Sequence, residues 1–110
     1  MQVTMIENLN TANYMAQTAQ SDCVVVFSAS WCPDCRFIEP MIEALSTELA
    51  GKVRFYKVSF DTELDLKDML QIRRIPTLLF YKGGVEVGER VVEPRSLEMI
   101  KGAIERALGV

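Results

Sequence analysis

Two cysteines three residues apart are the strongest chemical signal in this sequence of 110 residues. The segment Trp31-Cys32-Pro33-Asp34-Cys35 follows an apolar run and opens a predicted helix. Thiols at positions i and i+3 of a first helical turn lie side by side and can join in a disulfide with little backbone motion. Free N–H groups and the positive end of the helix dipole favour a thiolate at Cys32, and the thiolate is the reactive form. The motif therefore predicts thiol–disulfide exchange, with Cys35 on the first turn as the resolving thiol.

A metal site is the main alternative for this motif. The chain has no histidine, which excludes Ser-His-Asp and Cys-His catalysis and every zinc site that contains histidine. The remaining cysteine, Cys23, starts a predicted buried strand and is expected to be a small apolar core residue. A metal bound by Cys32 and Cys35 would therefore need carboxylates or a second copy of the chain. We expect no metal and no organic cofactor beside the redox-active pair.

Alternating strands and helices are predicted around the motif. Strands are expected over 3–6, 23–28, 53–60, 77–81 and 85–91, and helices over 11–20, 33–50, 64–71 and 95–108. The apolar run 23–28 indicates a central strand buried on both faces, and Lys82-Gly83-Gly84 predicts a hairpin. The order β-α-β-α-β-α-β-β-α predicts an α/β fold, with a central mixed β-sheet flanked by helices on both faces.

Local signals define the ends and faces of the predicted helices. Pro33 suits the first turn of its helix, Pro40 lies inside it without an N–H to donate, and Gly51 ends it. The helix over 11–20 follows Asn8 or Asn10 as a cap. Four of its residues share one face at helical spacing, which predicts that they are buried. They are Ala12, Met15, Ala16 and Ala19.

The composition predicts a folded domain without nucleic-acid or membrane partners. Hydrophobic residues make up 49% and charged residues 25%, as in ordinary globular proteins, and the net charge is −3. Nucleic-acid binding requires a basic stripe, which is absent. The longest apolar run, 23–27, is much shorter than a membrane span, and residues 1–10 do not match a signal peptide. We expect one domain over residues 1–110, a monomer, in the reducing cytoplasm.

The chain resembles the thioredoxin family over nearly its whole length. The resemblance rests on FSASWCPDCR at 27–36, Pro40, KVSFD at 57–61 and IPTLLFYKGG at 75–84. It implies a thioredoxin fold and disulfide exchange with protein substrates. It also implies an upstream electron donor of the thioredoxin-reductase type.

The resemblance also implies roles for individual residues. Cys32 would attack the substrate, Cys35 would resolve the mixed disulfide, and Trp31 would flank the thiols as an apolar lid. Pro76 would follow a cis peptide bond, which leaves the backbone of Ile75 free to pair with an extended substrate strand. The alternative for Pro76 is an ordinary proline at the start of a strand.

The main departure from the family pattern lies below the predicted thiols. Val26 stands where the family usually carries a buried carboxylate, so Cys35 lacks its usual proton acceptor. Asp34, Glu39 or a water could replace it. Lys57 matches the lysine that normally pairs with that carboxylate, and here it is either unpaired or a solvated lysine at a strand end.

Charged residues near the thiols are predicted to modulate them. Pro33-Asp34 replaces the family's usual Gly-Pro pair and is known in a related subgroup with narrower substrate preferences. Asp34 opposes a Cys32 thiolate by like charge, and Arg36 and Arg74 are expected to offset it. Arg74 either attracts acidic substrates or is a solvated arginine. The loop over 91–94 lacks the family's glycine. A solvated acidic face or cap is predicted at Asp61, Glu63, Asp65 and Asp68.

The sequence therefore predicts a protein-disulfide reductase. A substrate-restricted reductase or isomerase is the enzymatic alternative. The alternative without catalysis is a thioredoxin-fold interaction module that binds a partner through the same surface.

Overall fold

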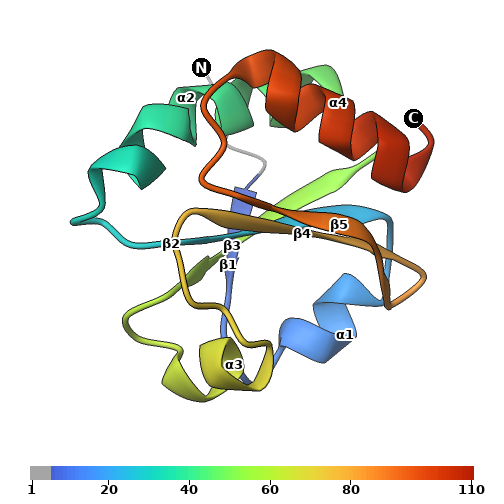
Figure 1. The fold of residues 1–110 in the computed structure, drawn as a ribbon. Coiled ribbons are helices and arrows are strands. Elements are labelled where there is room, and N and C mark those ends of the chain that lie inside the picture. Colours follow the sequence, from blue (N-terminus) through green and yellow to red (C-terminus); the bar gives the residue numbers. More distant parts are fainter. Residues whose placement is uncertain (1–5) are drawn as a thin grey trace.

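A computed structural model describes residues 6–110, which form one mixed sheet with helices on both faces (Figure 1). The element order matches the predicted alternation. The strands are β1 (Ile6–Leu9), β2 (Cys23–Ser28), β3 (Arg54–Ser59), β4 (Thr77–Lys82) and β5 (Val85–Val92). The helices are α1 (Tyr14–Thr18), α2 (Pro33–Glu48), α3 (Leu64–Met69) and α4 (Leu97–Leu108).

The sheet has β2 at its centre. Its strand order is β1-β3-β2-β4-β5, with β1 and β2 parallel to β3, and β4 antiparallel to both β2 and β5. Every residue from Cys23 to Phe27 is buried, as predicted for a strand that is covered on both faces. The predicted mixed sheet is confirmed, and the end of its central strand leads directly to the two thiols.

Helices α2 and α4 cover one face of the sheet, and α1 and α3 cover the other (Figure 1). Because successive side chains of a strand point to opposite faces, β2 contributes to two cores. Val24 and Val26 pack with α2 and α4, whereas Val25 and Phe27 pack on the opposite side. Val26 therefore faces the helix that carries the cysteines.

The start of α2 follows the prediction. Cys32 is the N-cap residue in extended conformation, and Pro33 occupies the first turn. The helix continues through Pro40 and ends at Glu48, two residues before the predicted end. Gly51, with a φ of +86°, follows in the turn that leads toward β3. The capping position of Cys32 and the proline that follows it therefore place the start of α2 at the cysteine motif.

The first helix lies within its predicted range, but its predicted bounds and buried face are wrong. The helix occupies only Tyr14–Thr18, because Asn10 and Asn13 exchange backbone-to-side-chain hydrogen bonds of 2.8 and 2.9 Å in the turn that precedes it. Tyr14 and Thr18 are buried, and the tyrosine packs against Phe27. A large aromatic ring determines the buried face more strongly than small alanines do. The residues predicted to be buried are all exposed: Ala12, Met15, Ala16 and Ala19.

Other boundaries differ from the prediction by one to three residues, most clearly those of the first strand and of α3. Residues 3–5 of the predicted first strand lie outside the described residues, and the described strand continues to Leu9 because it pairs with β3 over its whole length. Helix α3 ends at Met69, and Gln71 takes a positive φ of 58°. The predicted hairpin between β4 and β5 is confirmed, with Gly83 and Gly84 both at positive φ in its turn.

Candidate active site

Cys32 and Cys35 lie together where β2 gives way to α2. The backbone N–H of Cys35 donates to Cys32 Sγ at 3.2 Å, so the sulfur itself caps the helix. Each residue is 5% exposed, and both are free thiols. An N–H donor at the positive end of a helix favours negative charge on the sulfur it faces. The predicted proximity of the two thiols is confirmed.

The surroundings of Cys35 favour its protonated form. Burial, together with the hydrogen bond to Cys32, raises the pKa of the Cys35 thiol to about 12, against a smaller lowering effect from the Ala29 backbone. A thiol with such a pKa is almost entirely protonated near neutral pH. Any reaction that needs Cys35 as a thiolate near neutral pH would therefore be helped by a nearby base.

The cis Ile75-Pro76 bond lies against the thiols. This peptide bond is cis, as the family resemblance implied. Ile75 packs against the cluster of Ala29, Cys32 and Cys35, and its carbonyl oxygen is 3.9 Å from Cys32 Sγ. The Glu93 N–H donates to the Pro76 carbonyl at 2.8 Å, which attaches the loop after β5 to this bend. The structure therefore brings these two predicted site residues to the sulfur.

Trp31 is held by a residue whose role the sequence did not indicate. Its side chain is 62% exposed, and its indole N–H donates to Asp61 Oδ2 at 3.2 Å. Ser59 Oγ donates to the other carboxylate oxygen at 2.7 Å. The Ser59 bond is the larger effect that lowers the pKa of Asp61, with a smaller effect from Trp31. Asp61 is exposed, as predicted for a solvated face, and it also orients the tryptophan through this hydrogen bond.

The charged neighbours of the thiols pair differently from the prediction. Arg95 Nη1 lies 3.6 Å from Asp34 Oδ1, and Arg74 Nη1 lies 3.5 Å from Glu93 Oε1. The arginine that faces Asp34 is therefore Arg95, rather than Arg36 or Arg74. Exposed ion pairs of this kind contribute little to stability. Their effect at this site is to place paired charges around the entrance to the sulfurs.

A cavity lies beneath the thiols at the position of Val26. Val26 is 5% exposed and pairs in register with Lys57 of β3, so both side chains point toward α2. The cavity has a volume of about 40 Å³ and is lined by Cys35, Glu39 and Lys57 among others. The same three residues also line an open hollow of about 500 Å³ outside it. Among the described residues, no carboxylate lies within ion-pair distance of Lys57.

A comparison with protein families matches the model described as Thioredoxin to residues 5–106. This chain belongs to the thioredoxin family. It is 39% identical over 94 residues to thioredoxin C-2 of Corynebacterium nephridii, covering 83% of this chain and 87% of that protein. It is 38% identical over 86 residues to thioredoxin-2 of Saccharomyces cerevisiae, covering 76% of this chain and 82% of the yeast protein.

Longer relatives and a solved structure give the same result. The chain is 32% identical over 105 residues to chloroplastic thioredoxin M4 of Arabidopsis thaliana, which covers 94% of this chain but only 54% of that protein. The crystal structure of Malassezia sympodialis thioredoxin (Mala s 13) superposes with a TM-score of 0.83 at 27% identity, covering 97% of this chain and 96% of that one. The thioredoxin fold is thereby confirmed.

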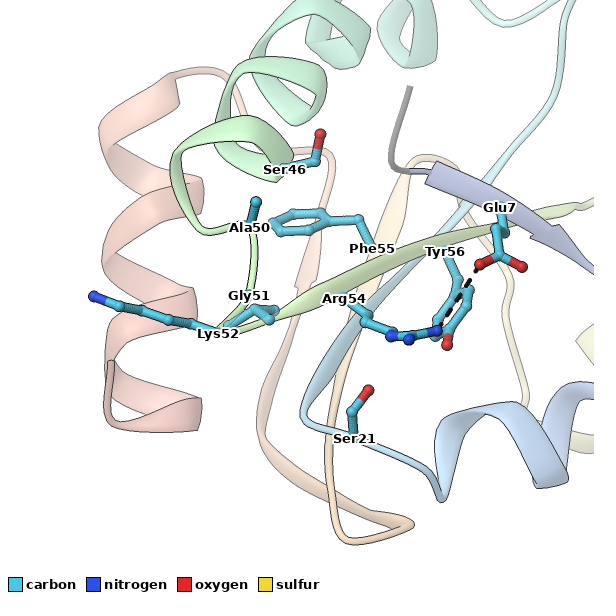
Figure 2. A pocket seen from close by; sticks show the side chains of 10 residues that line it. Glu7, Ser21, Ser46, Ala50, Gly51, Lys52, Arg54, Phe55 and Tyr56 are labelled. Atoms are coloured by element: carbon cyan, nitrogen blue, oxygen red, sulfur yellow. Dashed lines mark ion pairs between the residues drawn. The ribbon is translucent and has the colours of Figure 1, made fainter. Parts of the chain in front are cut away.

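A second hollow of this thioredoxin-family chain lies far from the thiols. Figure 2 shows this hollow beside the ion pair of Glu7 and Arg54. Its volume is about 460 Å³, and Arg54 Nη1 lies 4.0 Å from Glu7 Oε1. It surrounds the start of β3, whereas Cys32 follows the end of the parallel strand β2. The hydroxyls of Ser21 and Tyr56 are buried there without a hydrogen-bond partner among the described residues. This hollow therefore does not belong to the thiol site.

Two further properties concern metals and membranes. Within residues 6–110, no three side chains of His, Cys, Asp or Glu gather closely enough to hold a metal ion. No described helix has the length and apolar character needed to cross a bilayer.

Cys23 is fully buried, as predicted for a core residue.

Proposed function

We propose that this thioredoxin-family chain is a thiol–disulfide oxidoreductase that reduces protein disulfides through Cys32 and Cys35. The observation that carries the proposal is the capped sulfur of Cys32 at the entrance of α2, 3.9 Å from the Ile75 carbonyl of the cis-proline bend. A nucleophilic sulfur is thus placed next to backbone that a substrate can pair with.

The reaction is two successive exchanges. The Cys32 thiolate attacks one sulfur of a substrate disulfide, forms a mixed disulfide and releases the other substrate sulfur as a thiolate. Deprotonated Cys35 then attacks Cys32 Sγ, which breaks the mixed disulfide and releases the second substrate thiolate. The substrate gains two electrons, and the chain is left with a Cys32–Cys35 disulfide. No metal or organic cofactor takes part in the proposed reaction.

Substrate recognition follows from the groups around the sulfurs. An extended substrate segment pairs with the backbone at Ile75 and contacts the exposed ring of Trp31, as in strand addition. Asp34, Lys57 and Arg74 are proposed to modulate the site. An upstream reductase of the thioredoxin-reductase type returns the electrons. We further propose that the chain acts as a monomer in the reducing cytoplasm.

Disulfide reduction with insulin as substrate and dithiothreitol as electron source tests this function. We expect the parent chain to accelerate insulin reduction and Cys32→Ser to remove the acceleration, because the attacking sulfur is lost. Cys23→Ser is the matched control, since Cys23 is buried and distant from the proposed chemistry. It is expected to keep the activity of the parent.

The same assay separates the enzyme from an interaction module. A parent chain that binds a partner but does not accelerate insulin reduction, with binding retained by Cys32→Ser, would contradict the proposed reductase. Activity that persists in Cys32→Ser would contradict the assignment of the nucleophile.

A further inference from the structure

We propose that Glu39 accepts the proton of Cys35 during the resolving step, through the cavity beneath the thiols, with Lys57 attracting the Glu39 carboxylate toward that cavity. This inference rests on the proposed function, because the resolving step exists only if the chain exchanges disulfides. It assigns to Glu39 of α2 the role of proton acceptor for Cys35, which the apolar side chain of Val26 in the central strand cannot perform.

The chemical requirement is set by the environment of Cys35. Only a thiolate attacks a disulfide. With a pKa raised to about 12, roughly one Cys35 thiol in 100,000 is ionised at pH 7. A nearby base that takes the proton as the new sulfur–sulfur bond forms relieves this limitation.

The spacing on α2 places Glu39 next to Cys35. The two residues are four apart on one helix, so their side chains lie on the same face about 6 Å apart along the axis. Both side chains line the 40 Å³ cavity. A cavity of that size accommodates one water molecule. A proton therefore has a short route from the sulfur to the carboxylate, directly or through one water.

Lys57 approaches the same cavity from the sheet. Its register with Val26 points the half-buried side chain toward α2, and it lines both the inner cavity and the outer hollow together with Glu39. It has no ion pair with any described carboxylate at rest. Its ammonium group is therefore available to attract the Glu39 carboxylate toward the cavity.

The other charged groups around Cys35 fit the role less well. Asp34 lines neither hollow and is paired with Arg95. Glu43 lines the inner cavity but lies eight residues along the helix, about 12 Å from Cys35 along the axis. Arg36 and Asp61 line only the outer hollow, and Asp61 is already bonded to Trp31 and Ser59. Among the described residues, Glu39 is the one carboxylate that lines both the cavity and the outer hollow.

The proposed step is balanced without a further reactant. The proton of Cys35 moves to Glu39, and the Cys35 sulfur bonds to Cys32 Sγ as the bond to the substrate sulfur breaks. The leaving substrate sulfur carries the electron pair away and is protonated from solvent. Glu39 is exposed, so it then releases its proton to water through the outer hollow.

Stopped-flow reaction of the reduced chain with the chromogenic disulfide dithiobis(nitrobenzoate) separates the two exchanges. Attack by Cys32 releases one coloured thiolate at a rate proportional to reagent concentration. Attack by Cys35 releases the second at a rate independent of reagent concentration. Cys35→Ser assigns the phases, because it keeps the first and loses the second.

We expect Glu39→Gln to slow the second phase about tenfold or more near pH 7, a modest loss for a general base, while the first phase is unchanged. The deficit shrinks as pH rises, because hydroxide takes over the deprotonation of Cys35. Glu39→Asp restores part of the rate, since it keeps a carboxylate. Glu43→Gln, a neighbouring carboxylate of the same helix, leaves both phases unchanged.

A second phase in Glu39→Gln that is as fast as in the parent, or faster, overturns the inference. A purely electrostatic carboxylate would give the faster result, because its removal eases the ionisation of Cys35. An equal slowing by Glu43→Gln also overturns it, because the effect would then belong to any charge in the cavity. A parent chain without two phases instead contradicts the proposed function itself.

Discussion

Cys32 and Cys35 share one helical turn but have different surroundings. The sulfur of Cys32 accepts a backbone N–H and lies against the cis-proline bend. The thiol of Cys35 lies against the apolar interior, where burial raises its pKa. The same helix start therefore holds one sulfur in a backbone hydrogen bond beside the cis-proline bend and the other as a buried neutral thiol, which suits the proposed division of attack and resolution between them.

The residue types could be predicted from the sequence, whereas their long-range partners could not. Two thiols three residues apart and a proline after Ile75 are visible in the sequence, because their chemistry is local. The contacts of Trp31 with Asp61 and of Asp34 with Arg95 join segments that only the folded chain brings together. No spacing rule within one element predicts such pairs.

The third cysteine makes a pH-dependent contribution to stability. Burial raises the pKa of the Cys23 thiol from its ordinary value of 9.0 to about 12. The folded state thus prefers the neutral thiol, and this preference is full below pH 9 and is lost as pH rises toward 12. Between about pH 8 and about pH 10.5, we expect the unfolding free energy of the parent to fall about 2 kcal/mol more than that of Cys23→Ala.

Urea unfolding under reducing conditions at the two pH values measures this difference. The packing lost in Cys23→Ala is the same at both pH values, so it cancels in the comparison. Equal pH dependence of the two chains would show that Cys23 ionises as readily in the fold as in the unfolded chain.

At the scale of elements, α1 is attached to the sheet by a pair of buried tyrosines. Tyr14 Oη donates to Tyr81 Oη at 2.8 Å, and the two rings meet edge to face at 5.8 Å between centroids. This contact explains why the short helix turns Tyr14 inward instead of its alanines. Apolar periodicity alone does not predict this contact, because it takes no account of a hydroxyl on α1 whose hydrogen-bond partner lies on the distant strand β4.

We expect Tyr14→Phe to lower the unfolding free energy by about 1–2 kcal/mol, because it removes this hydrogen bond and leaves the Tyr81 hydroxyl buried without a partner. Tyr56→Phe is a matched control, since Tyr56 is equally buried but its hydroxyl has no partner among the described residues. It should cost nothing or stabilise the chain. Urea denaturation of the two variants makes the comparison, and equal losses would contradict a specific role for the tyrosine pair.

The longer elements were predictable for physical reasons. β2 is an unbroken apolar run, and α2 begins at a proline that suits a first turn, so their types and starts agree with the sequence. Helix ends depend on turns and caps formed with neighbouring segments. The reciprocal bonds of Asn10 and Asn13 shorten α1, and the positive φ of Gln71 follows the early end of α3.

At the scale of the whole molecule, topology brings the site together from distant segments. The central strand β2 delivers Cys32 to one end of the sheet, and the segment that precedes the antiparallel strand β4 delivers Ile75 and Pro76 to the same end. The alternation of elements predicts the mixed sheet. The cavity that links Cys35 to Glu39 and Lys57 could not be predicted, because it depends on how α2 packs over β3.

The central claim is that Cys32 and Cys35 form a reversible two-electron redox pair. Equilibration of the chain with mixtures of reduced and oxidised glutathione, followed by thiol trapping and peptide mass mapping, tests it most directly. We predict that only the fully reduced chain and a Cys32–Cys35 disulfide are populated, and that Cys23 stays a free thiol. The Cys32–Cys35 pair is expected to remain a disulfide unless reduced glutathione is in large excess. A persistent glutathione adduct on Cys32, or a disulfide that includes Cys23, would contradict the account.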